Sequence, residues 1–330
     1  MIKTKICDMV GIKYPIIQGG LGPFETTNLA AAISNAGALG MISHPLRPSP
    51  DIIKDNLRNV VKLTDNPIGV NIRVAREDVR TGAPQLIDAI LEERQSNKEV
   101  EKRLKVFLTG AGDPTLFSKK IRDAGLIHFH LVPSVYHAKR AENAGVDVLI
   151  ASGHEAGGHV HHDPVHTLVL VPSVVKSVKI PVIASGGFCD GSGLAAALSL
   201  GAEGMFMGTR FVATEECLVN KNYKDAIVSS SERDTIVLPG FLGPIRYLKN
   251  EYTNKLQKMV DNGVTDGRRM AWQLPKLAKA GLEEDIVHGH VTVGMVAGRI
   301  DTIPKVKDLI DGIIKEAEKT IDSLSSRVKD

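Results

Sequence analysis

Residues 151–159 read ASGHEAGGH, which places two histidines and a glutamate on a glycine-rich turn. The apolar run 146–150 precedes this turn, so a short buried strand is expected to end where the polar residues begin. Histidine readily gives or takes a proton near neutral pH, and glycine lets a backbone come close to a ligand. The pattern predicts an enzyme site whose catalytic histidine, His159, ends the loop. A cluster of solvated loop histidines is the alternative.

The same loop resembles the zinc-binding pattern HExxH, but His154 and His159 are one residue too far apart. A step of five residues turns them to different faces of a helix, and Gly157 and Gly158 would interrupt that helix. Three more histidines follow at 161, 162 and 166 without a coherent ligand spacing. No metal site is expected.

Two earlier segments carry amide side chains at predicted strand ends. Gln18 precedes Gly19 and Gly20, and Asn71 ends the run 69–71. A side-chain amide offers both a donor and an acceptor, which suits the pyrimidine edge of a flavin. A helix cap for Asn71 and a simple turn for the glycines are the alternatives.

Two later loops, 184–193 and 207–211, combine glycines with the start of a helix. Unpaired N–H groups and the helix dipole favour a phosphate at such a place. These loops predict a phosphate cradle, with ordinary tight turns as the alternative. The proposed phosphate ligands are Gly186, Gly187, Gly208 and Thr209.

The stretch 191–196 reads GSGLAA and matches a dinucleotide-binding fingerprint. That fold needs an acidic residue at the end of the next strand, but here the strand ends Met207-Gly208-Thr209. We therefore interpret Asp190 as a helix N-cap and reject a Rossmann domain.

The elements that must position these residues form a repeating pattern. Stretches with helical spacing separate short apolar runs, and several helices end in a glycine at the C-cap. Eight strand–helix units before about residue 215 predict a TIM (β/α)8 barrel, with a doubly wound open sheet as the alternative. The predicted strands are 16–18, 39–42, 68–71, 106–109, 127–132, 148–151, 182–185 and 204–207.

The alternation of predicted strands and helices is interrupted between residues 218 and 288. This segment has Pro-Gly turns, the single tryptophan Trp272 and predicted helices over 247–260 and 270–280. The predicted division is a barrel of residues 1–217 and 289–330, with 218–288 inserted as a small, mainly helical cap or substrate domain. A peripheral insertion without contact to the site is the alternative. Apolar residues from 306 to 321 recur at three- and four-residue steps and predict an amphipathic closing helix.

Composition narrows the class of protein. Lys plus Arg (41) nearly balance Asp plus Glu (38), and aromatic residues make up 4%, so nucleic acid is not an expected partner. Three scattered cysteines form no CxxC pair, which fits a reducing compartment. No apolar run is long enough to span a bilayer, so we expect a cytoplasmic protein without a membrane partner.

These motifs together resemble the FMN-dependent nitronate monooxygenase family, formerly called 2-nitropropane dioxygenases. The family includes enoyl-[acyl-carrier-protein] reductase II and an NAD(P)H:quinone reductase branch. The resemblance runs nearly end to end and rests on eight motifs in the same order: YPIIQGG, LTDNPIGVNI, TGAGDP, LVPSV, GHEAGGH, PVIASGGFCDG, MGTRF and HGHVTVGMVAGRI.

The resemblance implies a TIM barrel that holds FMN non-covalently, with His159 as the catalytic histidine. It assigns flavin contacts to Gln18, Gly19 and Asn71. Ser152 and Gly153 would line the flavin ring. The ribityl phosphate would contact Ser185, Gly187, Gly208 and Thr209.

The leading functional prediction is a nitronate monooxygenase that oxidises alkyl nitronates with O2. The alternatives are an enoyl-[acyl-carrier-protein] reductase II or a quinone reductase, for which NAD(P)H would be the co-substrate. The small-molecule substrate is accordingly a nitronate, an enoyl thioester or a quinone. A non-redox phosphate-binding isomerase or aldolase on the same barrel is a more distant alternative. A homodimer is compatible with each of these.

One residue departs from the family pattern. Many relatives read AGQ near the C-terminus, where this chain has Ala297-Gly298-Arg299. Arg299 would favour an anionic substrate if its segment folds over the barrel mouth, with a solvated surface arginine as the alternative.

Overall fold

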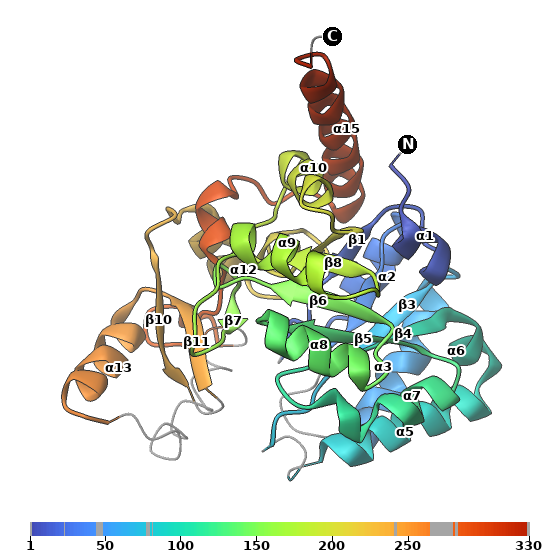
Figure 1. The fold of residues 1–330 in the computed structure, drawn as a ribbon. Helices are drawn as coiled ribbons and strands as arrows, with labels where there is room; N and C mark the ends of the chain where they lie inside the picture. The colour runs from blue at the N-terminus through green and yellow to red at the C-terminus, as the bar shows by residue number, and fades with distance from the viewer. Residues whose placement is uncertain are drawn as a thin grey trace.

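A computed structural model describes residues 2–22, 24–43, 49–76, 80, 82–240, 243–264, 280 and 283–328. Its centre is a sheet of eight parallel strands in the order β1-β9-β8-β6-β5-β4-β3-β2 (Figure 1). A parallel bridge between Ile17 and Leu39 joins the two outer members, so the sheet closes into a TIM barrel. The strands are β1 Ile16–Gln18, β2 Gly40–Ile42, β3 Ile68–Arg73, β4 Leu104–Gly110, β5 Ile127–Val132, β6 Val148–Ser152, β8 Val182–Ser185 and β9 Met205–Met207.

Helices follow the strands and cover the outside of the barrel (Figure 1). The predicted C-cap glycines all adopt left-handed backbone angles, with φ of +93° at Gly37, +76° at Gly125, +83° at Gly145 and +86° at Gly201. The helices of the barrel region are α1 Lys5–Val10, α2 Thr27–Asn35, α3 Pro50–Leu63, α5 Ala83–Ser96, α6 Lys98–Arg103, α7 Ser118–Asp123, α8 Val135–Asn143, α9 Thr167–Ser177, α10 Gly191–Ser199 and α11 Thr209–Val212, with the 3-10 turn η1 Pro114–Leu116.

Alternate residues of the strands point inward and fill the barrel, so the interior is a packed core. Helix α1, which precedes β1, adds Ile6, Cys7 and Val10 to the same cluster and therefore covers the barrel end opposite the strand C-termini. The other end of the barrel, where the strands finish, is the end at which a cavity opens. The inward side chains include Ile17, Met41, Val106, Leu108, Phe129, Val148, Ile150, Ile183 and Phe206.

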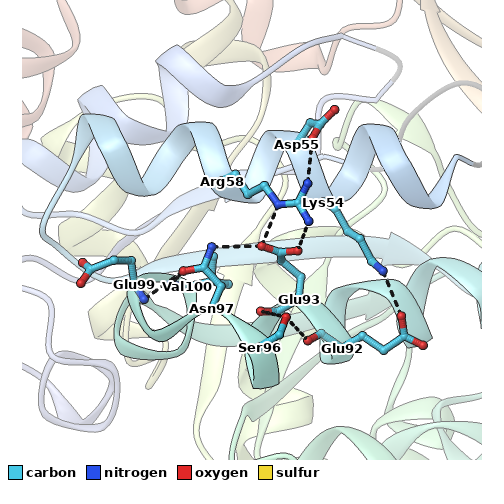
Figure 2. A network of polar contacts seen from close by, with 9 residues as sticks. All are labelled: Lys54, Asp55, Arg58, Glu92, Glu93, Ser96, Asn97, Glu99 and Val100. Carbon is cyan, nitrogen blue, oxygen red and sulfur yellow. Dashed lines mark hydrogen bonds and ion pairs between the residues drawn. The ribbon is translucent and has the colours of Figure 1, made fainter.

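A carboxylate clamp holds two outer helices against each other (Figure 2). Glu93 of α5 is 3% exposed and accepts hydrogen bonds from Arg58 of α3, Nε to Oε1 at 2.9 Å and Nη2 to Oε2 at 2.6 Å. Asn97 donates a third bond to Glu93 at 3.0 Å. The hydrogen bonds from Arg58 are the main reason why the pKa of Glu93 is lowered.

The segment after the barrel strands contains a β-hairpin that the sequence did not predict. Strands β10 Thr235–Gly240 and β11 Gly243–Leu248 pair antiparallel, and β11 pairs with the short strand β7 Gly158–His159. Helices α12 Lys221–Val228 and α13 Glu251–Asp261 accompany the hairpin. The helix predicted over 247–260 therefore starts later than expected, because residues 243–248 extend into β11. The predicted helix 270–280 and Trp272 lie outside the described residues, apart from Ala280.

The C-terminal segment forms the turn η3 Met295–Arg299 and the helix α15 Val306–Ser325. The apolar face of α15 packs on α10 and α2, as the three- and four-residue spacing predicted. The last turns of α15 extend beyond the rest of the fold (Figure 1), and Ile321 is 38% exposed. Among the described residues, no helix is both long and apolar enough to cross a membrane. The division at 218 and 288 stays a prediction.

Candidate active site

A cavity of about 920 Å³ opens where the barrel strands end. Most predicted site residues meet in its wall although they come from distant parts of the chain. Ten of them line it: Gly19, Asn71, Ser152, Gly153, His159, Ser185, Gly186, Gly187, Gly208 and Thr209.

Gln18 departs from the prediction. Its side chain is fully buried and is not part of the cavity wall. Its Nε2 donates to the Met41 carbonyl at 3.1 Å, and the Met41 N–H donates to its Oε1 at 2.9 Å. The amide thus joins β1 to β2 where the barrel closes, so the role of this side chain is structural.

The wall formed by β1 and β3 has no room for larger residues. A Cβ on Gly20 would lie 1.9 Å from Oδ1 of Asn71, so a glycine is required beside that amide. Asn71 Nδ2 donates a long bond of 3.4 Å to the Leu108 carbonyl. The N–H of Gly19 donates to the Met207 carbonyl at 2.7 Å, which ties β1 to β9. The Asn71 amide is therefore held at the cavity surface in one place.

The loops after β8 and β9 expose backbone donors. The N–H groups of Gly187, Gly208 and Thr209 have no acceptor within the described part of the chain. Gly187 has φ of +86°, an angle that glycine adopts without strain. The hydroxyl of Thr209 accepts from the Gly294 N–H at 2.9 Å, which leaves its own hydrogen available. Such a set suits an oxygen-rich anion.

The start of α10 is closed to such an anion. Asp190 accepts from the Gly193 N–H at 2.8 Å, and Glu316 of α15 accepts from the Gly191 N–H at 2.8 Å. The interpretation of Asp190 as an N-cap is confirmed. Arg299 forms an ion pair with Asp190 at 2.5 Å, is half exposed and is absent from the cavity wall, which agrees with the alternative of a surface arginine.

His159 lies in β7, where it pairs with Ile245 of β11. Its side chain is partly exposed to the cavity. Burial, with a smaller contribution from the charge of Arg73, lowers the pKa of His159 to about 4. The ring is therefore neutral at pH 7 and can accept a proton or hydrogen bond from one nitrogen and donate from the other.

The loop before His159 is held from two sides. Glu155 accepts bonds from the N–H of Thr167 at 3.0 Å and from its hydroxyl at 2.9 Å. Buried Arg246 of β11 donates to the carbonyls of His154 at 2.8 Å and Ala156 at 3.2 Å. These contacts give Glu155 a structural role. No metal-binding group of His, Cys, Asp or Glu occurs in the described ranges.

The sequence analysis did not assign several of the cavity residues, among them Arg73, His130 and His290. His290 stacks on Tyr252 with a centroid distance of 5.8 Å, and its Nε2 lies 2.6 Å from the Thr292 hydroxyl. The signal for His130 was the sequence HFH at the end of a predicted strand. Alternation puts both histidines of that run on one face.

Comparisons with known proteins agree with this geometry. The family model for nitronate monooxygenase matches residues 3–316. The chain is 33% identical to the (3aS,4S,5R,7aS)-5-hydroxy-7a-methyl-1-oxo-octahydro-1H-indene-4-carboxyl-CoA dehydrogenase of Rhodococcus jostii, with 98% of each chain covered. It is 32% identical to a probable nitronate monooxygenase of Staphylococcus aureus, over 78% of this chain and 81% of that protein.

Among solved structures, FabK from Thermotoga maritima superposes with a TM-score of 0.90 at 38% identity, and the match covers 99% of this chain and 100% of that one. The likeness extends through the hairpin and the closing helix as well as the barrel. From residue 3 to residue 316, the chain belongs to the nitronate monooxygenase family, and it is an oxidoreductase.

Proposed function

We propose that this oxidoreductase binds FMN in the cavity. The support comes from two features of the wall: backbone donors without acceptors at Gly187, Gly208 and Thr209, and the Asn71 amide packed against Gly20. The donors would hold the phosphate, and the amide would meet the edge of the flavin ring. When bound, FMN supplies the electron and hydride transfer that amino-acid side chains cannot perform.

The substrate that this site supports best is an alkyl nitronate, oxidised with O2. The observation that carries this proposal is the neutral imidazole of His159 within the electrostatic reach of Arg73, since both residues line the cavity. The guanidinium favours an anionic substrate. His159 would orient a nitronate oxygen by hydrogen bonding, or take the α-proton from a neutral nitroalkane.

A second candidate is oxidoreduction of an acyl thioester with a nicotinamide nucleotide. Its support is the extent of the likeness: the CoA-ester dehydrogenase and FabK, an enoyl-ACP reductase II, match this chain almost end to end, whereas the nitronate monooxygenase match covers 78%. In that reaction His159 would hydrogen bond the thioester carbonyl. A quinone would be the electron acceptor in the remaining alternative.

The experiment is anaerobic flavin reduction. The purified protein, reconstituted with FMN, is mixed separately with a nitronate, NADH and NADPH while the absorbance near 450 nm is followed. Rapid bleaching by the nitronate alone supports the monooxygenase. Rapid bleaching by a nicotinamide nucleotide supports a reductase, and turnover with an enoyl thioester or a quinone then separates the two. A protein that binds no FMN contradicts the cofactor assignment.

A further inference from the structure

The strand that carries His159 is short, and its own side chains do little to fix its register. Strand β7 consists of Gly158 and His159 and lies at the edge of a three-stranded sheet. Within the described residues it pairs with β11 alone, where Arg246 is opposite Gly158 and Ile245 is opposite His159. Because a glycine offers no side chain to hold a pairing, a strand of this composition can slip along its partner.

A slip of one residue would misplace the imidazole. Side chains alternate between the two faces of a strand, so the slip would turn His159 to the other face. In the observed register, Ile245 lies directly opposite His159, and both residues line the cavity. Arg246, the next residue of β11, projects from the opposite face and is not part of the cavity wall. The register of this pairing therefore decides whether the imidazole faces the cavity.

Arg246 bonds the chain just before β7 through one edge of its guanidinium. Its Nη2 donates to the His154 carbonyl at 2.8 Å, and its Nε donates to the Ala156 carbonyl at 3.2 Å. These two nitrogens share an edge of the planar group, which suits two carbonyls that lie two residues apart. The third nitrogen, Nη1, donates to the Thr235 hydroxyl of β10 at 2.9 Å. One side chain thus connects the chain before β7 to both strands of the hairpin.

These bonds oppose a slip of β7. A shift by one residue moves a strand by about 3.3 Å along its partner, which would break both bonds from Arg246 to the loop. The Met295 N–H holds the carbonyl between them, that of Glu155, at 3.0 Å. Of these three bonds, the two from Arg246 come from the strand with which β7 pairs. They therefore fix the position of the loop along β11.

The charge of Arg246 is buried at a cost. Its side chain is 5% exposed, and burial lowers its pKa, an effect that Glu155 opposes. In the described part of the chain, its bonds go to two carbonyls and a hydroxyl, and no carboxylate forms an ion pair with it. Burial of an unpaired charge is unfavourable, so stability alone would favour a neutral side chain here. The planar set of donors, which a lysine lacks, accounts for an arginine at this position.

We propose that Arg246 is a positioning residue for His159, because its two bonds to the loop fix the register of β7 on β11 and so keep the imidazole at the cavity. The inference rests on the proposed function, which assigns His159 a contact with the substrate. It adds a residue outside the cavity wall to those on which turnover depends.

Hydrogen exchange tests the register without turnover. In the full chain, reconstituted with FMN, Arg246→Lys keeps a positive charge but loses the paired donors. The probe is the Val160 N–H, which donates to the Pro244 carbonyl at 3.0 Å in the observed register. We expect this amide to exchange at least about tenfold faster in the variant, because the pairing opens more often. Exchange at the wild-type rate would overturn the proposal, whether or not the enzyme has the proposed activity.

The matched control is Arg103→Met. It removes another buried arginine, which lies on α6 outside the cavity wall and bonds Glu99 and Asp65. The Val160 amide should exchange at the wild-type rate in this control. Equal acceleration in Arg103→Met and Arg246→Lys would show a general loss of stability and would contradict the proposal.

Kinetics test the consequence for His159, with the substrate that bleaches the wild-type flavin and rates expressed per bound flavin. Arg246→Lys should lower kcat at least about tenfold and change KM by less than about threefold, as expected for a misplaced reacting group. In Arg246→Ala, millimolar guanidinium should restore part of kcat, whereas ammonium should not. Wild-type kcat in Arg246→Lys, or equal recovery with both cations, would contradict the proposal. An inactive wild-type protein would contradict the proposed function and leave the exchange measurement to decide this inference.

Discussion

At the scale of single residues, three imidazoles in the cavity wall share one property. Burial is the main cause that lowers the pKa of His130 and His159 to about 4 and that of His290 to about 3. The site therefore offers neutral donors and acceptors at pH 7, and the arginines in its wall, Arg73 and Arg140, carry positive charge. A neutral imidazole can take up a proton, which an imidazolium cannot do.

His159→Ala should keep its FMN and lose turnover by about 10²-fold or more, because proton transfer by a positioned side chain contributes that much. In the wild type, the proton-accepting form exists above the lowered pKa, so activity should hold down to about pH 5 and decline as the pH falls through about 4. The measurements are flavin absorbance and a pH profile of kcat. Full turnover in the variant would remove His159 from the mechanism.

The glycine loops and His159 lie together in the cavity wall, as their motifs indicated, because each motif lies within a few residues. Their roles stay predictions. Gln18 was misplaced because its amide is satisfied by Met41, which belongs to the next strand. His290 and Arg73 were missed because their place in the wall depends on how distant segments of the chain meet at the cavity.

At the scale of elements, all eight barrel strands could be predicted to within about two residues, because buried parallel strands form continuous apolar runs. The hairpin β10–β11 could not. Its Pro and Gly residues suggested turns, and its stability depends on tertiary pairing with β7. The same pairing explains why the start of α13 was misjudged.

The clamp between α3 and α5 gives a prediction at this scale. Glu93→Gln should lower the free energy of unfolding by about 1–3 kcal/mol, less than for a fully buried pair because the Arg58 side chain is 49% exposed. Chemical denaturation at pH 7 measures it. Lys54→Met, which removes an ion pair to the exposed Glu92 on the same two helices, is the control and should change stability by less than about 1 kcal/mol. Equal losses of unfolding free energy in the two variants would show that the contacts of Glu93 stabilise the fold no more than an exposed ion pair does.

At the scale of the whole molecule, the site is assembled from both the barrel and the segment that follows it. Arg246 of β11 holds the His159 loop through two carbonyls, and a Cβ on Gly157 in that loop would lie 2.6 Å from the Gly294 nitrogen. The barrel alone would keep the contact between Glu155 and Thr167 but would lack the supports from Arg246 and Gly294. A homodimer remains compatible with this arrangement.

Four histidines with strongly lowered pKa values should make the fold sensitive to mild acid. The pKa values of His128 and His290 are about 3 and those of His130 and His159 about 4, below the usual 6.5. Between these values the unfolded chain binds protons that the folded chain does not, so stability is complete above about pH 6.5 and is lost as the pH falls. By pH 5, each of these histidines should lower the free energy of unfolding by on the order of 1 kcal/mol or more.

Urea unfolding of the FMN-bound protein at several values between pH 7.5 and pH 5 measures this loss. Carboxylates with lowered pKa values contribute mainly below about pH 4.5, so the chosen window isolates the histidines. A free energy of unfolding that is constant across the window would show that these rings have the same pKa values in the folded and unfolded chain.

The pairing of β7 with β11 also sets an order of events during synthesis. All eight barrel strands leave the ribosome before β11 does, so the barrel can close while the two residues that include His159 still lack their partner strand. The carbonyls that Arg246 holds are likewise unsupported until that strand arrives. A nascent chain stopped before residue 243 would therefore lack a finished active site even where its barrel strands have paired.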